Sequence, residues 1–289
     1  MASRSGSASC GRKEYKIPDG FFGVGSSPLL EGDKLIVMVG GQPNSGVVAF
    51  EAATGKPLWN NVGKSTWDKA ATGWGGEAEY EWLGDEMVVS YSSPICATIH
   101  GQRHLLVCTR QGLVSLDPKT GEHRFSFWFR SRQDQTVTAM TPVVDGDRIF
   151  LSNAYYKTGS VLLRVKPGND GVTEVWRSLA LEIHWTRPVL AGGHLYAFSG
   201  RNEPDARFRC VELATGAVKW DRNEGWPNGG HAKLRAGEAA PNVFGRGSAI
   251  LADGKLIALG EAGLLGLFKP TADRLEELAR CQQVKMFNR

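Results

Sequence analysis

The 289-residue sequence has few cysteines, little excess charge and no long hydrophobic run. Its five cysteines form no CxxC motif and no adjacent pair, which argues against a disulfide framework or a zinc site. No apolar stretch approaches the roughly 20 residues of a membrane-spanning helix, and residues 1–13 lack the apolar core of a secretory signal. The net charge is +4 and no Lys/Arg block is visible, so we expect no nucleic-acid partner.

The motifs of common catalytic sites are also missing. There is no GxSxG, no HExxH and no glycine loop followed by Lys-Ser/Thr, which leaves no signature of a hydrolase, a zinc protease or a phosphate-binding loop. His100 and His104 have the spacing of helical metal ligands, but they flank a predicted hairpin turn. We therefore predict no catalytic residue and no metal ligand, and we favour a non-enzymatic protein over an enzyme.

Glycine is abundant instead, with 36 residues where average usage of about 7% would give about 20. One pattern recurs in four copies, and in a fifth that lacks the Thr-Gly turn and the tryptophan: a small residue and proline, three apolar strands separated by a Gly/Asp turn and a loop, a Thr-Gly turn, and a fourth strand with an aromatic residue. The first four copies start at Pro28, Pro94, Pro142 and Pro188, and the turn glycine follows 27 to 29 residues later; the fifth starts near Ser248.

Four strands in a repeat of about 40 to 50 residues is the signature of a propeller blade. We therefore predict an all-β protein, a β-propeller of four-stranded antiparallel blades, with about five blades recognisable. The propeller domain is expected over residues 21–289, after a disordered polar tail at 1–20. In each of the first four blades a large ring falls late in the fourth strand. These rings are interpreted as structural docking groups between blades, in preference to a ligand stack, and they are Trp59, Phe125, Trp176 and Trp220.

Residues 49–59 (AFEAATGKPLW) and 210–220 (CVELATGAVKW) resemble the tryptophan-docking repeat of pyrroloquinoline-quinone-type (PQQ-like) propellers. The resemblance covers about residues 21–284. The same repeat builds quinoprotein dehydrogenases and the non-enzymatic BamB-type propellers of the outer-membrane assembly machinery. The segments YSSP (91–94), TRQG (109–112) and GRNE (200–203) are most similar to BamB-like proteins. Such propellers usually close with about seven or eight blades, so we expect a partial chain or an open arc completed by a partner.

Two sets of loops differ in length. The turns after the first and third strands are short in every repeat, and all the long insertions fall in the other connections: residues 40–46, 61–90, 153–160, 199–208 and 221–245. Loops on a rigid scaffold are where binding usually resides, so we predict the binding face on the long-loop side. For Trp74 and Trp226, packing of their own loops is an equal alternative. The predicted ligand- or partner-binding residues are Trp74, Arg110, Arg130, Arg132, His184, Trp185, Arg187, Arg201, Asn202, Glu203 and Trp226.

The resemblance implies a non-catalytic binding scaffold without a cofactor, with protein partners in the periplasm or cell envelope. The alternative is a quinoprotein dehydrogenase, or a remnant of one, that binds PQQ and Ca²⁺. In that case Trp185 would be the floor under the quinone, and Asn202 and Glu203 would supply oxygen ligands to Ca²⁺.

Overall fold

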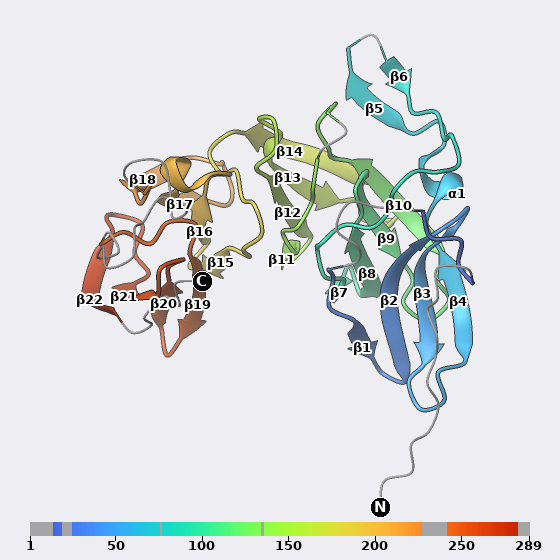
Figure 1. The fold of residues 1–289 in the computed structure, drawn as a ribbon, viewed down its shortest axis with the longest axis horizontal. Coiled ribbons are helices and arrows are strands. Elements are labelled where there is room, and N and C mark those ends of the chain that lie inside the picture. Colours follow the sequence, from blue (N-terminus) through green and yellow to red (C-terminus); the bar gives the residue numbers. More distant parts are fainter. Residues whose placement is uncertain (1–13, 19–24, 76, 134–135, 227–241, 283–289) are drawn as a thin grey trace, which may run out of the picture. The chain divides into compact units, whose positions relative to one another are not determined.

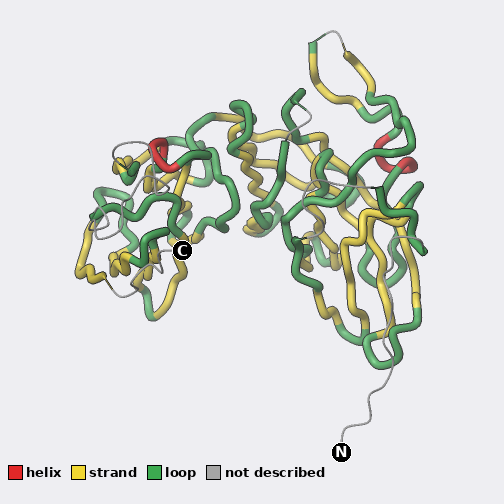
Figure 2. The backbone as a smooth tube through the Cα atoms, in the orientation of Figure 1, coloured by secondary structure: helices red, strands yellow, loops and turns green. Residues whose placement is uncertain are grey.

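The computed structural model describes residues 14–18, 25–75, 77–133, 136–226 and 242–282. Over these residues the chain is almost entirely strand and loop (Figure 2), and all its strands but one hairpin form five four-stranded antiparallel sheets. The prediction of an all-β protein built from propeller blades is confirmed. Among the described helices, none has the length and apolar character needed to cross a membrane. Of the predicted tail, residues 14–18 are described, and Tyr15 among them is buried; the rest lies outside the described residues.

Each sheet is one copy of the sequence repeat, with its strands hydrogen-bonded in chain order (Figure 1). The first contains β1 (Leu29–Glu31), β2 (Lys34–Gly41), β3 (Ser45–Glu51) and β4 (Pro57–Asn61), and the second contains β7 (Ile95–Ile99), β8 (Gln102–Cys108), β9 (Gly112–Leu116) and β10 (His123–Trp128). The third contains β11 (Val143–Asp145), β12 (Arg148–Asn153), β13 (Gly159–Val165) and β14 (Val172–Ser178).

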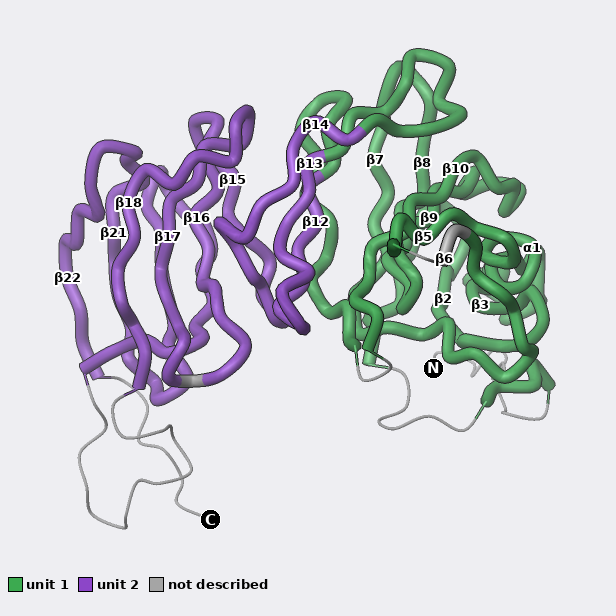
Figure 3. Tube along the Cα trace, turned by 90° about the horizontal axis from the view of Figure 1, so that it is seen from above, with its two compact units in different colours: residues 1–149, 163–173 green, residues 150–162, 174–289 purple. Residues whose placement is uncertain are grey.

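The last two sheets follow the same plan. The fourth contains β15 (Val189–Ala191), β16 (His194–Ser199), β17 (Arg207–Glu212) and β18 (Val218–Asn223). The fifth contains β19 (Ser248–Ala252), β20 (Lys255–Leu259), β21 (Leu264–Lys269) and β22 (Glu276–Gln282). The chain divides into two compact units (Figure 3): unit 1 comprises residues 1–149 and 163–173, and unit 2 comprises residues 150–162 and 174–289.

Apolar, β-branched runs make the middle strands, and glycine makes the turns between them. The first six of the seven residues of β3 are buried, as expected for a strand covered on both faces. In the hairpin between β19 and β20, Gly254 has φ +67°, a left-handed conformation that glycine adopts without a steric penalty. The Gly/Asp turns predicted from the sequence therefore lie at the strand ends in the structure.

One predicted loop was wrong. Residues 40–46 were expected to form a long connection, but β2 runs through Gly41 and β3 begins at Ser45, which leaves a three-residue turn. The two glycines serve close packing instead. A Cβ on Gly41 would lie 2.2 Å from the Tyr15 carbonyl oxygen, and a Cβ on Gly40 would lie 1.9 Å from Cγ2 of Val89.

The long connection at 61–90 has secondary structure of its own. It contains the one-turn helix α1 (Lys64–Trp67) and the hairpin of β5 (Ala71–Trp74) and β6 (Glu77–Glu79). Figure 1 shows this hairpin extending past α1. Trp67 is fully buried and anchors the insertion in the core of unit 1.

The late-strand rings contact the next sheet along the chain. Trp176 Nε1 donates a hydrogen bond to the Leu213 carbonyl oxygen at 2.9 Å, and Trp220 Nε1 donates to the Thr271 carbonyl oxygen at 2.8 Å. Trp59 lies so close to the turn of the second sheet that a Cβ on Gly121 would be 2.5 Å from its Cε3 atom. These contacts have the geometry that the docking interpretation requires.

Phe125 occupies the same position in the second sheet but has no N–H to donate. It is buried, and its ring lies 5.9 Å from that of His104. The His104 ring provides a polar link to the turn before β14, because its Nε2 lies 2.9 Å from Asn169 Oδ1 while its Nδ1 lies 2.8 Å from Ser115 Oγ. A buried histidine with both ring nitrogens hydrogen-bonded is a structural group in this position.

The fourth and fifth sheets share an ion-pair network centred on Glu277. The hydrogen bond from Arg280, joined by one from Arg222, lowers the pKa of Glu277 to about 2 against the opposing effect of burial. We expect Glu277→Gln to lower the free energy of unfolding by about 2 kcal/mol at pH 7. Because the pKa is lowered on folding, this stabilisation is present above the ordinary carboxyl pKa of 4.5 and is lost as the pH falls towards 2.

Urea unfolding of the wild type and of Glu277→Gln between pH 7 and pH 2 measures this difference in the free energy of unfolding. Glu276→Gln is the matched control, since the Glu276 carboxylate lies 3.8 Å from Lys269 Nζ in a more exposed pair. A difference between wild type and Glu277→Gln that stays constant down to pH 2 would contradict the prediction.

Candidate functional site

The predicted binding residues of unit 1 lie around an aromatic cluster at the base of the 61–90 insertion. The Trp128 ring lies 5.4 Å from that of Trp74 and 4.8 Å from that of Tyr80. The guanidinium carbon of Arg130 lies 5.9 Å from the Trp128 ring, and that of Arg132 lies 5.8 Å from the Trp74 ring. These contacts hold the insertion against the second sheet. Because the Trp74 ring takes part in them, they support packing of its own loop as the role of Trp74.

Arg110 and Arg132 make backbone links in the same unit. The Arg110 amide donates to the Val88 carbonyl oxygen at 3.0 Å, and Arg132 Nη2 donates to the Gly75 carbonyl oxygen at 3.0 Å. Both contacts join the 61–90 segment to loops of the second sheet. They do not define a ligand cavity.

In unit 2 the long loops bring aromatic and arginine side chains together. We call this group the cation–aromatic stack: Tyr155 and Tyr156 from the β12–β13 loop, His184 and Trp185 from the β14–β15 connection, Arg201 from the β16–β17 loop, and Arg246 from the segment before β19. Four loops of three successive sheets contribute to it, and all lie on the predicted long-loop side.

The rings and guanidinium groups of the stack are in direct contact. The His184 ring stacks on that of Trp185 with centroids 4.1 Å apart and planes 27° apart. The guanidinium carbon of Arg246 lies 4.5 Å from the Trp185 ring, and that of Arg201 lies 4.3 Å from the Tyr155 ring. The Tyr155 hydroxyl lies 3.0 Å from His184 Nε2, which connects the two halves of the stack.

Electrostatics keep His184 neutral. Burial, with the nearby charges of Arg246 and Arg201, lowers the pKa of His184 to about 4. Glu261 neutralises Arg246, with Oε2 2.9 Å from Nη2 and Oε1 3.1 Å from Nε. A bidentate pair of this kind fixes the orientation of the guanidinium group.

The other predicted residues of unit 2 lie outside the stack. Arg187 is exposed, and Asn202 Nδ2 donates to Asp205 Oδ2 at 3.2 Å within its own loop. Glu203 begins the 3₁₀ turn Glu203–Asp205, and its side chain is outside the described part of the structure. Trp226 is 3% exposed and lies against Gly245, so its ring packs its own loop and is not available to a partner.

Sequence reasoning missed four residues of this site: Tyr155, Tyr156, Arg246 and Glu261. The tyrosine pair was detectable, since it lies in a loop already assigned to the long-loop side. Arg246 and Glu261 had no such signal, because each becomes significant only through a partner distant in the sequence.

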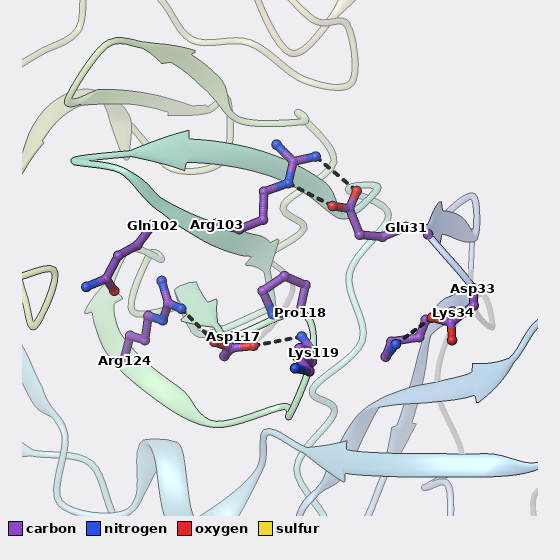
Figure 4. A pocket seen from close by; sticks show the side chains of 10 residues that line it. Glu31, Asp33, Lys34, Gln102, Arg103, Asp117, Pro118, Lys119 and Arg124 are labelled. Atoms are coloured by element: carbon purple, nitrogen blue, oxygen red, sulfur yellow. Dashed lines mark hydrogen bonds and ion pairs between the residues drawn. The ribbon is translucent and has the colours of Figure 1, made fainter.

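A charged pocket of about 430 Å³ lies on the short-turn side of unit 1 (Figure 4). Ion pairs occupy its walls: Arg103 binds Glu31 through Nε at 2.7 Å, and Arg124 binds Asp117 through Nη2 at 2.7 Å. Asp117 also accepts the backbone amide of Lys119 at 2.7 Å. Three of its four cationic side chains, those of Lys34, Arg103 and Arg124, are paired with its three carboxylates, which leaves one excess positive charge, on the exposed Lys119.

Repeated four-stranded blades with a tryptophan packed on the following Thr-Gly turn define a β-propeller protein of the PQQ-like repeat type. The chain belongs to the family of outer membrane protein assembly factor BamB, whose family model matches residues 14–222. The resemblance inferred from the repeats is therefore confirmed. A search of curated proteins found no match.

Solved structures of several propellers are similar to this one. BamB from Moraxella catarrhalis is 13% identical with a TM-score of 0.54, over 88% of this chain and 60% of that one. Sqt1 from Saccharomyces cerevisiae is 12% identical with a TM-score of 0.52, over 93% and 64%. A europium-containing methanol dehydrogenase is 10% identical with a TM-score of 0.51, over 86% and 49%. The chain thus spans 49% to 64% of these proteins, and at these identities the likeness concerns the fold alone.

Proposed function

We propose that this protein is a non-catalytic scaffold of the cell envelope that binds a partner protein through the cation–aromatic stack. The observation that carries the proposal is the stack itself, in which Trp185 is 46% exposed and Tyr156 is 42% exposed. Tryptophan, tyrosine and arginine dominate the hot spots of protein interfaces. Here neighbouring side chains already hold them in place, so less conformational entropy is lost on binding.

Membership of the BamB family supports an envelope role. The family description names a factor of outer membrane protein assembly, and a propeller presents loops on a rigid frame suited to that work. We extend that role to this chain as a proposal, with protein partners in the assembly machinery.

The alternative, a PQQ- and Ca²⁺-dependent dehydrogenase, fits the described residues poorly. Trp185, the expected floor of the quinone site, already has His184 stacked on it and Arg246 against it. Asn202 is engaged with Asp205. No group of three or more His, Cys, Asp or Glu side chains within the described ranges could hold a metal ion. We therefore derive no chemistry through these cofactors.

Site-specific photo-crosslinking in the native cell tests the scaffold proposal. A benzophenone amino acid at Tyr156 should crosslink to a discrete envelope protein, and Trp185→Ala should abolish that crosslink. The control position is Leu251, which is 45% exposed and lies next to the short β19–β20 turn of the same unit.

Identical crosslinks from both positions, or none from Tyr156, would contradict the proposal. Saturable quenching of tryptophan fluorescence by PQQ with Ca²⁺, reversed by a chelator, would overturn it in favour of the dehydrogenase.

A further inference from the structure

Arg201 differs from the other arginine of the stack in having no acidic partner. Arg246 is paired with Glu261, whereas among the described residues no carboxylate forms an ion pair with the Arg201 guanidinium group. Two aromatic rings lie against it, with the guanidinium carbon 4.3 Å from the Tyr155 centroid and 5.1 Å from the Tyr156 centroid. Ring faces hold a guanidinium by cation–π attraction and leave its N–H edge available for hydrogen bonds.

The backbone of Arg201 is also fixed. Its carbonyl oxygen accepts a hydrogen bond from Arg246 Nη1 at 3.0 Å. The preceding Gly200 has φ +122°, and a Cβ there would lie 2.6 Å from the Asp205 carbonyl oxygen, so the loop closes tightly behind it. The guanidinium is therefore held in position before any ligand binds, which reduces the entropic cost of binding.

The stack has one uncompensated positive charge. Glu261 neutralises Arg246, and His184 is neutral near pH 7 because burial and the two arginines lower its pKa to about 4. Two acidic residues of the neighbouring loops have other partners. Asp205 accepts a hydrogen bond from the Asn202 side-chain amide, and Glu182 interacts with the charges of Arg209 and Lys157. A single guanidinium without an acidic partner matches the charge of a monoanion better than that of a phosphate dianion.

We propose that Arg201 binds the carboxylate of an aspartate or glutamate in an acidic segment of the partner protein, while Trp185 and Tyr156 contact apolar residues beside that acid. Guanidinium and carboxylate fit each other through two parallel N–H···O hydrogen bonds, which gives direction as well as charge complementarity. The inference rests on the proposed function of the same stack and names the chemistry of the partner.

Selection of a random-peptide display library on the purified protein tests this without knowledge of the partner. Selected peptides should be enriched in Asp or Glu next to an aromatic or large apolar residue. For a selected peptide, Arg201→Gln should weaken binding about tenfold or more. Arg201→Lys should restore binding only in part, because the lysine ammonium cannot form the two parallel hydrogen bonds that a planar guanidinium makes with a carboxylate. Arg164→Gln removes one exposed arginine charge elsewhere and should leave the affinity unchanged.

A double-mutant cycle isolates the interaction between Arg201 and the acidic residue of the peptide. Replacing the peptide's acid with its amide should weaken binding to the wild type but have little further effect on Arg201→Gln. Circular dichroism establishes that each variant is folded. Selected peptides without acidic enrichment, or a peptide affinity that Arg201→Gln does not change, would overturn the inference. Arg201-dependent binding to phosphatidylcholine vesicles with phosphatidylglycerol, without any peptide preference, would overturn it in favour of a lipid headgroup.

The outcomes also separate this inference from the proposed function. If the Tyr156 crosslink persists in Arg201→Gln, the scaffold proposal stands and the role of Arg201 is refuted. If no crosslink forms although acidic peptides bind through Arg201, the scaffold proposal fails and the binding chemistry stands.

Discussion

Replacing Trp220 with alanine is expected to lower the free energy of unfolding by about 3 kcal/mol. The indole ring packs 5.3 Å from Phe208 and 6.0 Å from Tyr196, in the core shared by the fourth and fifth sheets. Its Nε1 donates to the Thr271 carbonyl oxygen at 2.8 Å. Alanine would remove both the apolar contact and the hydrogen bond, and would leave a cavity between the sheets. Urea unfolding followed by circular dichroism measures the loss.

Two further variants separate the parts of this effect. Trp220→Phe keeps most of the ring and removes the donor, so we expect a smaller loss, of about 1 kcal/mol. Trp185→Ala removes an indole that is 46% exposed, and it should change stability by less than about 1 kcal/mol. A loss for Trp185→Ala equal to that for Trp220→Ala would contradict the distinction between docking and binding tryptophans.

The repeat was predictable because each element depends on local sequence. The strand pairs, the Gly-Asp turns and the positions of Trp59, Trp176 and Trp220 all follow from patterns within one blade. The wrong loop at 40–46 shows the limit of such patterns. Glycine is typical of turns, but Gly40 and Gly41 are required inside a strand, where Val89 and Tyr15 approach too closely for any side chain.

The candidate site was predictable only in part, since it forms from loops of different blades. Aromatic and arginine residues in long loops indicated His184, Trp185 and Arg201. Whether such a residue is exposed or buried depends on its neighbours in space, and for this reason Trp226 was grouped with Trp185 although it is 3% exposed. The pairing of Arg246 with Glu261 likewise required coordinates, because no local pattern links residues of a loop and the following β20–β21 turn.

Gly121→Ala is expected to lower the free energy of unfolding by about 3 kcal/mol, although it adds a single methyl group. Gly121 has φ +75°, a left-handed conformation that costs alanine about 1 kcal/mol. The added Cβ would also lie 2.5 Å from Cε3 and 2.6 Å from Cδ2 of Trp59, so the ring must move. Gly254→Ala is the matched control, with φ +67° and no atom within 4 Å of the added Cβ, and should cost only about 1 kcal/mol.

The cause of the larger effect can be isolated by removing the ring. In a Trp59→Leu background the added methyl group no longer meets an indole, so the cost of Gly121→Ala should fall to that of Gly254→Ala. Urea midpoints of the four proteins in this cycle measure the coupling. A cost that is unchanged by Trp59→Leu would show that backbone conformation alone is responsible. A cost that falls with the ring removed would establish that the turn glycine is required because the tryptophan of the preceding blade packs directly on it.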